Sequence, residues 1–157
     1  MKKSKIVKAS HLAARLARKR RQGKKIVFTN GVYDLLHAGH ATLLAKAKRL
    51  GDVLVVGINT DASVRRLKGP NRPIANQRDR AELLAALKPV DYVALFNEDT
   101  PYELIQKLRP DVLVKGGDYS SGRIVGRDLV KRVVRIPLVK GRSSSNMIAK
   151  ILRAYGR

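Results

Sequence analysis

Residues 25–50, KIVFTNGVYDLLHAGHATLLAKAKRL, predict a strand, a glycine-containing turn and a helix in direct succession. The opening apolar run, residues 26–28, has the β-branched and aromatic composition of a buried parallel strand. It ends at the Thr-Asn-Gly of residues 29–31, where a glycine allows the backbone to come close to a ligand. Leucines and alanines then recur with helical spacing over residues 41–50. The turn therefore lies at the carboxyl end of a strand, which is where α/β proteins bind their ligands.

Two histidines, His37 and His40, occupy this turn in the pattern His-Ala-Gly-His. Imidazoles three residues apart at a helix start face the same way, and the helix N-terminus beside them attracts anions. The chain contains no GxxxxGK[ST] sequence, so a P-loop is excluded. We therefore predict a phosphate site built on the histidine pair. Two ordinary polar histidines on a loop explain the motif alone equally well.

Strand and helix patterns alternate along the rest of the chain. Strands are predicted at residues 26–28, 53–58, 90–96, 111–114 and 133–139, and helices at 11–21, 41–50, 62–67, 77–87, 101–108 and 146–153. Ser10 is expected to cap the first helix, and Thr100 to open a capping box at the fifth. The alternation predicts an α/β fold, a Rossmann-like doubly wound parallel sheet of five strands with helices on both faces. At 157 residues a single domain is expected, with residues 1–23 as a basic helical segment leading into the first strand.

Polar residues follow the second and fourth predicted strands and open the last helix. They are Asn59 and Asp61; Lys115, Gly116, Gly117, Asp118 and Tyr119; and Ser143, Ser144 and Ser145. Because the carboxyl ends of parallel strands share one edge of a sheet, we expect these residues to converge with the histidines on one cleft. Asp61 and one of the serines have a simpler alternative role, since both residue types are good helix N-caps.

Composition limits the possible classes of protein. The chain has no cysteine and three histidines, so disulfides and cysteine-ligated metals are excluded and a histidine metal cluster is not expected. No apolar run approaches the roughly 18 residues of a membrane span. A cytoplasmic protein without membrane insertion is the expectation, with an organelle transit peptide as the alternative for the arginine-rich start. The formal charge of +22 points to nucleic acid, anionic lipid or phosphorylated small molecules as partners.

Five motifs together carry a resemblance to a known family. They are FTNGVYDLLHAGH (28–40), GINTDASVRRLKGPNRPI (57–74), VDYVALFNEDTP (90–101), PDVLVKGGDY (110–119) and GRSSSNMIAKI (141–151). The first resembles the histidine motif of the nucleotidyltransferase superfamily that includes the cytidylyltransferases. The whole set, which spans nearly the full chain, resembles the D-glycero-β-D-manno-heptose 1-phosphate adenylyltransferases in their stand-alone form. Val-Tyr replaces the usual Cys-Phe, Ser-Ser-Ser replaces Ser-Thr-Thr, and residues 126–139 form a shorter segment than usual.

The resemblance implies transfer of AMP from ATP to heptose 1-phosphate, with release of pyrophosphate, in the synthesis of ADP-heptose for the lipopolysaccharide inner core. It also implies Mg²⁺ that bridges the phosphates with few protein ligands, so no residue is assigned to the metal. The implied catalytic residues are His37, His40 and Lys46, with a solvated surface role as the open alternative for Lys46. The implied nucleotide contacts are Thr29, Asn30, Gly31, His37, Gly39, His40, Lys115, Gly116, Gly117, Asp118, Tyr119, Ser143, Ser144 and Ser145. The implied contacts with the sugar phosphate are Asp34, Asn59, Asp61, Lys68, Arg72 and Arg80.

Two alternatives remain open. A cytidylyltransferase that acts on a polyol phosphate such as glycerol 3-phosphate would share the fold and the histidine motif. A basic nucleic-acid-binding protein would explain the charge, but aromatic residues make up only 4% of the chain and no strand offers a row of them for stacking bases. No specific nucleic acid is therefore expected as a partner, and the family resemblance favours a homodimer or higher homo-oligomer.

Overall fold

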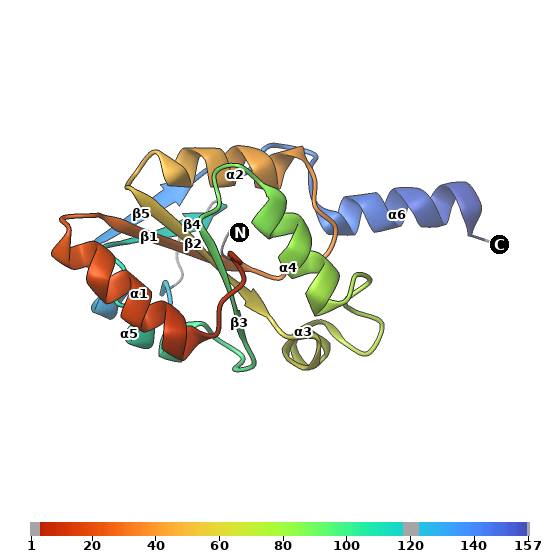
Figure 1. Ribbon diagram of the computed structural model, residues 1–157. Coiled ribbons are helices and arrows are strands. Elements are labelled where there is room, and N and C mark those ends of the chain that lie inside the picture. The colour runs from red at the N-terminus through yellow and green to blue at the C-terminus, as the bar shows by residue number, and fades with distance from the viewer. Residues whose placement is uncertain (1–3, 118–122, 157) are drawn as a thin grey trace.

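The computed structural model describes residues 4–117 and 123–156. Within them, five parallel strands form one sheet in the order β3-β2-β1-β4-β5 (Figure 1). The strands are β1 (Ile26–Gly31), β2 (Val53–Asn59), β3 (Tyr92–Phe96), β4 (Val112–Gly116) and β5 (Arg132–Ile136). The helices are α1 (Ala9–Arg21), α2 (Ala38–Lys48), α3 (Asp61–Lys68), α4 (Gln77–Ala86), α5 (Tyr102–Leu108) and α6 (Ser144–Tyr155), with a short 3₁₀ helix η1 at Arg127–Leu129. The predicted α/β fold with a doubly wound parallel sheet is confirmed.

Each face of the sheet carries its own apolar layer. On one face Leu44 of α2 and Leu84 of α4 pack against the strands, and on the other Leu16 of α1 and Leu108 of α5 do so. All four leucines are completely buried, and burial of a leucine side chain contributes about 1.5–3 kcal/mol. Because β2 lies inside the sheet under both layers, all seven of its residues are buried, which explains its unbroken apolar sequence.

The sheet grows in two directions from β1. Strands β2 and β3 lie on one side of β1, and β4 and β5 lie on the other. The carboxyl ends of β1 and β4 therefore flank a topological switch point, where open α/β sheets form their ligand crevice. The turn that carries the histidines connects β1 to α2 at this edge of the sheet.

Several predicted helix starts are wrong, and three of them show why. Helix α1 begins at Ala9, before the predicted cap Ser10, and has no side-chain cap. Helix α5 begins at Tyr102 with Pro101 at the N-cap position, so the predicted capping box of Thr100 does not form. Helix α2 begins at Ala38 and not at residue 41, because the side chain of the preceding histidine caps it.

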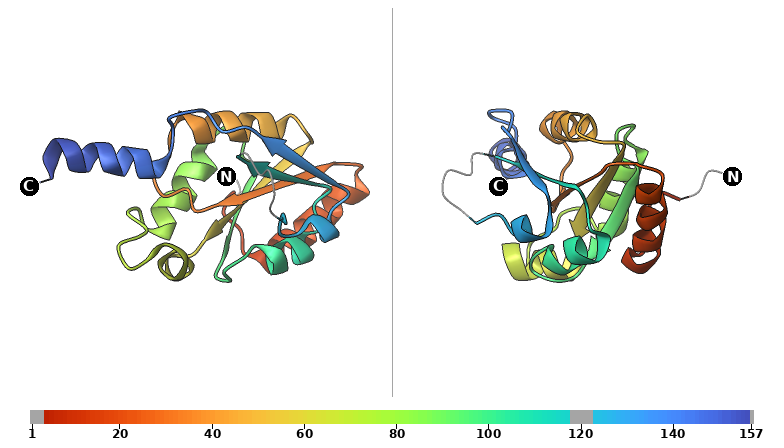
Figure 2. Two further views of the ribbon diagram at one scale, coloured as in Figure 1. Left: turned by 180° about the vertical axis from the view of Figure 1, so that it is seen from behind. Right: turned by 90° about the vertical axis from the view of Figure 1, so that its left-hand side faces the viewer.

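Helix α6 extends away from the body of the molecule (Figures 1 and 2). None of its residues is buried. Met147, Ile151, Leu152 and Tyr155 are exposed by 38% to 83%, so α6 has an uncovered apolar side. No helix in the described residues is long and apolar enough to cross a membrane.

Candidate functional site

The two histidines form the N-terminal cap of α2. Nδ1 of His37 accepts a hydrogen bond from the Gly39 N–H at 3.1 Å, and the His37 N–H donates to Nδ1 of His40 at 3.4 Å. The two rings stack with their centroids 3.8 Å apart. Because each Nδ1 accepts an N–H, the proton of each neutral ring is on Nε2. Neither Nε2 has a hydrogen-bond partner among the described residues, so both Nε2–H groups are available to a ligand.

The surroundings of the pair keep both imidazoles neutral. Burial, followed by the charge of His37, lowers the pKa of His40 to about 4. Burial, followed by the positive charge of Arg142, lowers the pKa of His37. At neutral pH the pair therefore offers two uncharged hydrogen-bond donors beside the positive end of the α2 dipole. This combination suits a phosphate oxygen.

Two neighbouring residues fix the positions of the rings. A Cβ atom at Gly39 would lie 2.9 Å from the His37 ring, so any larger residue there would displace the ring. The ring of Tyr33 lies 5.0 Å from that of His40, between centroids. Burial raises the pKa of Tyr33 to about 12, so its phenol stays neutral. Tyr33 was not among the predicted site residues, although its position between the strand-end glycine and the first histidine indicates a place near the site.

A cavity of about 330 Å³ opens at the carboxyl ends of the strands, with His40 in its wall. The predicted site residues Thr29, Asn30, Gly31, Asn59, Lys115 and Gly116 also line it. Nζ of Lys115 donates to Oδ1 of Asn30 at 2.5 Å. Burial lowers the pKa of Lys115 to about 8, which leaves most of the amine charged at pH 7. Phe96 of β3 also lines the cavity, so the structure brings residues from four strands together around His40 and Lys115.

A second cavity, of about 620 Å³, lies beside His37 at the start of α6. Arg142, Lys150 and Arg153 line it, so it is strongly cationic. Arg142 was not among the predicted site residues, although a cation directly before a helix N-cap is typical of a phosphate site. The lining of this cavity favours an anion, as does the histidine pair beside it.

The three serines at the start of α6 have different roles in the structure. Ser143 is the N-cap, and its Oγ accepts the Asn146 N–H at 3.0 Å. Ser144 Oγ donates to the carbonyl of Leu35 at 3.0 Å and so ties α6 to the turn before the histidines. Ser145 is exposed. The simpler cap role thus applies to Ser143, and contact of the serines with a nucleotide stays a prediction.

Two residues predicted to contact the sugar phosphate, Asp34 and Arg72, are bound to each other. Nε of Arg72 donates to Oδ2 of Asp34 at 2.6 Å, and the N–H groups of Ile74 and Ala75 donate to the same carboxylate. Burial alone would raise the pKa of Asp34, but these donors outweigh it, and the pKa lies below its ordinary value. The pair therefore anchors the loop that contains Arg72, Ile74 and Ala75 to the turn that carries the histidines.

Arg80 is completely buried. Its guanidinium donates to the carbonyl oxygens of Ala75, Val32 and Asn59 and, at 2.8 Å, to Oδ1 of Asp61. Because it faces protein atoms, it joins the segments around β1, β2 and α3 and does not line either cavity. In this arrangement the guanidinium contacts protein atoms. Contact of Arg80 with a sugar phosphate stays a prediction.

The remaining predicted residues lie apart from the cavities or beyond the described chain. Lys46 and Lys68 are exposed and line neither cavity. Asp61 does not cap α3, because Thr60 is the N-cap. Gly117 follows β4 with φ of 109°, in the region that favours glycine. Asp118 and Tyr119 lie outside the described residues.

The donors of the site suit anions better than metal ions. No group of three or more His, Cys, Asp or Glu side chains that could hold a metal occurs in the described part of the chain. Among the described residues Asp99 is the acid that lines the cavity of His40, and Nε of Arg66 pairs with it at 2.9 Å. A metal ion at this site would therefore find few protein ligands among the described residues.

Known proteins are similar in sequence to this chain over most of its length. A family model described as cytidylyltransferase-like matches residues 28–150. The bifunctional protein HldE of Syntrophotalea carbinolica is 59% identical over 140 residues, and that of Geobacter metallireducens is 55% identical over 157. These alignments cover 87% and 98% of this chain but 29% and 32% of the two relatives, so the chain spans about a third of their length.

Solved structures share the fold. The lipopolysaccharide core biosynthesis protein from Thermoplasma volcanium superposes with a TM-score of 0.65 at 31% identity, over 75% of this chain and 100% of that one. Pantoate-beta-alanine ligase from Francisella tularensis superposes with a TM-score of 0.57 at 18% identity, over 94% of this chain and 78% of that one. The second likeness concerns the fold alone.

Proposed function

The chain belongs to the cytidylyltransferase-like family, and we propose that it transfers AMP from ATP to D-glycero-β-D-manno-heptose 1-phosphate, giving ADP-heptose and pyrophosphate. One observation supports a reaction at phosphate groups. His37 and His40 present a pair of neutral Nε2–H donors, and the charged Lys115 lies at the same edge of the sheet. The five motifs and the likeness to a lipopolysaccharide core biosynthesis protein support the choice of sugar.

In the proposed reaction a phosphate oxygen of the sugar phosphate attacks the α-phosphorus of ATP. The bond from that phosphorus to the bridging oxygen of the β-phosphate breaks, and pyrophosphate leaves in line. A phosphate monoester is already anionic at neutral pH, so the attack needs no general base. Catalysis then consists of positioning the two substrates and stabilising the charge that develops on the phosphate oxygens.

The two cavities suit the two ends of the nucleotide. His40 and Lys115 would bind phosphate oxygens in the smaller cavity, and Gly116 in its wall would lie near the adenosine. His37, Arg142 and Ser143 would hold the leaving pyrophosphate in the larger one. Mg²⁺ bound with ATP would neutralise part of the triphosphate charge, through phosphate oxygens more than through protein ligands.

Pyrophosphate release tests the proposal. Purified protein with Mg²⁺ is given ATP or CTP, each with heptose 1-phosphate or glycerol 3-phosphate. Turnover with ATP and the heptose alone is the expected result. Turnover with CTP and glycerol 3-phosphate would replace the substrates and keep the phosphate site. Absence of turnover in all four mixtures, with folded protein, would refute the enzymatic proposal and favour the nucleic-acid-binding alternative.

A homodimer or higher homo-oligomer is also proposed, with the uncovered side of α6 as its contact. A helix of this length is marginal in water unless its apolar side is covered. Met147, Ile151 and Tyr155 recur every four residues and so form one stripe on α6. A second copy that contributes the same stripe would cover it in a twofold symmetric contact.

The mass in solution decides this point. The unmodified protein should sediment as a dimer or larger, and Ile151→Glu with Leu152→Glu should give a monomer. Leu83→Glu on α4 is the matched control, because Leu83 is also an exposed leucine, at 54%. A monomeric unmodified protein would contradict the proposal.

We further propose that residues 1–157 act as a single nucleotidyltransferase domain in the cytoplasm, where ATP is available.

A further inference from the structure

A basic groove lies at the edge of the sheet opposite the histidines. It has a volume of about 610 Å³ and is formed beneath α1, at the residues where β2 and β3 begin. The histidines are at the carboxyl ends of the strands, and all strands are parallel, so the groove is on the far edge of the sheet from the cavities described above. The proposed reaction makes no use of it.

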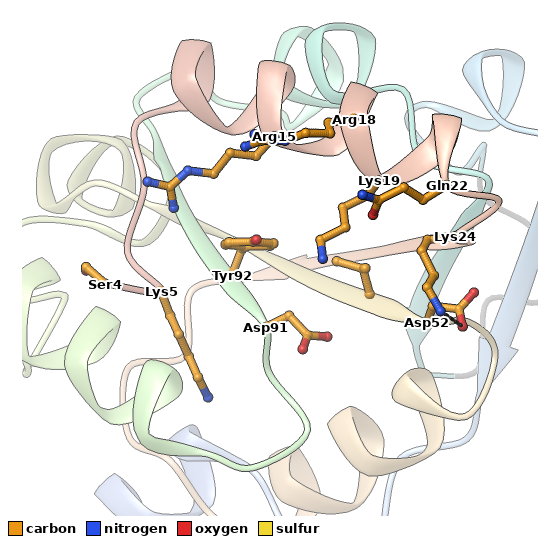
Figure 3. A pocket seen from close by; sticks show the side chains of 11 residues that line it. Ser4, Lys5, Arg15, Arg18, Lys19, Gln22, Lys24, Asp52, Asp91 and Tyr92 are labelled. Atoms are coloured by element: carbon orange, nitrogen blue, oxygen red, sulfur yellow. Dashed lines mark ion pairs between the residues drawn. The ribbon is translucent and has the colours of Figure 1, made fainter. Parts of the chain in front are cut away.

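Five cationic side chains surround the groove. They are Lys5, Arg15, Arg18, Lys19 and Lys24. Figure 3 shows Arg15 and Lys19 extending from α1 towards Tyr92, with Lys5 on the other side. Arg18 and Lys19 lie three and four residues after Arg15 on α1, so both are neighbours of Arg15 on the helix surface.

Two carboxylates in the groove leave Arg15, Arg18 and Lys19 unneutralised, because other groups engage them. Asp91 accepts from Nζ of Lys48 at 2.5 Å and from the Leu54 N–H at 2.7 Å. Asp52 accepts the N–H of Lys25 at 2.8 Å and pairs with Lys24. In the described structure the side chains of Arg15, Arg18 and Lys19 form no ion pair or hydrogen bond with protein.

An anion would relieve this concentration of like charge. Arg15 and Lys19 are only partly exposed, so water screens their mutual repulsion less than it would on an open surface. The volume of the groove lies within the range of small-molecule sites. Its several cations, set apart along the groove, suit a chain of linked phosphates better than a single one.

We propose that the groove is a second binding site, for a small anion with two or more linked phosphate groups, such as inorganic triphosphate or a nucleoside triphosphate. Among the described lining residues Tyr92 supplies the one aromatic ring, which is enough for one base and too little for a strand of stacked bases. The bound anion would connect α1 to the beginning of the sheet. Because it would bind the folded chain alone, it would also raise the melting temperature.

Titration calorimetry with inorganic triphosphate tests the proposal, in about 150 mM KCl so that weak surface attraction is screened. The groove variant carries Arg15→Gln, Arg18→Gln and Lys19→Gln. The control variant carries Lys8→Gln, Arg21→Gln and Arg127→Gln, which remove the same charge from exposed positions outside the groove. ATP, titrated in parallel, shows whether a nucleoside adds affinity to the phosphates.

The unmodified protein and the control variant should each bind two equivalents of triphosphate. The groove variant should bind one equivalent, at the histidine site. If the histidine site binds no triphosphate, the unmodified protein and the control variant should each bind one equivalent and the groove variant none, so failure of the proposed function is distinguishable from failure of this site. Equal loss in both variants, or no loss in the groove variant, would overturn the proposal. Tighter groove-dependent binding of a single-stranded RNA than of triphosphate would overturn the small-anion assignment.

Discussion

Nζ of Lys115 lies 2.5 Å from Oδ1 of Asn30, and this hydrogen bond joins the carboxyl ends of β4 and β1 across the switch point of the sheet. The contact aims a charged amine into the cavity that contains His40. It also partly buries the amine, which lowers the pKa of Lys115 to about 8. The same geometry that places the cation therefore brings its titration close to physiological pH.

Activity should consequently fall as the pH rises through about 8. Only the protonated amine of Lys115 attracts phosphate oxygens, so kcat/KM for ATP, which reports the free enzyme, should decrease with a midpoint near the pKa of about 8. Lys115→Arg should remove this midpoint, because a guanidinium stays charged. A wild-type profile without a step there, or a step that survives Lys115→Arg, would show that another group is responsible.

Removal of the His40 donor should lower turnover at least ~100-fold, the scale expected for loss of a group that stabilises transition-state charge. His40→Ala is compared with His11→Ala, which changes an exposed histidine on α1. Pyrophosphate release is the measurement, and circular dichroism checks that both variants fold. Near-normal turnover of folded His40→Ala would exclude the proposed role.

Acid should destabilise the protein through the same histidine. The native pKa of His40 is about 4 and the ordinary value is 6.5, so between these limits the unfolded chain binds a proton that the native chain does not. The free energy of unfolding should therefore decrease as the pH falls from 6.5 towards 4. Urea titrations across this range should show a shallower pH dependence for His40→Asn than for the unmodified protein. Equal slopes would contradict a neutral His40 in the folded state.

The sequence was a good guide to the sheet and a partial guide to the site. Strands covered on both faces have unbroken apolar sequences, so β1 and β2 were identifiable without a structure. Arg80 and Lys115 are both cations close to predicted ligand positions, yet one is buried against carbonyl groups and the other reaches a cavity. That difference depends on partners distant in the chain, Val32 for Arg80 and Asn30 for Lys115, and local patterns do not contain it.

Glycine at position 39 should be needed for the His37 ring and not for the helix. In a helix Gly→Ala ordinarily stabilises, by roughly 0.5–1 kcal/mol. Here the new Cβ would lie 2.9 Å from the ring, so Gly39→Ala should displace His37 and lower turnover at least about 10-fold. In the His37→Ala background the same change should stabilise, because the ring is gone. A Gly39→Ala variant as active as the unmodified protein would show that the ring has room to move.

Replacement of Arg80 separates a structural role from substrate binding. Arg80→Met should lower the free energy of unfolding by about 3–5 kcal/mol, because Asp61 loses its buried partner. Arg78→Met is the control, since Arg78 is exposed on the same helix and its loss should change stability by at most about 0.5 kcal/mol. Arg80→Lys, assayed while folded, then decides the second question. An unchanged KM for the sugar phosphate would agree with a guanidinium that only holds the fold together, whereas a KM raised about 10-fold with kcat preserved would show that the substrate reaches Arg80 after all.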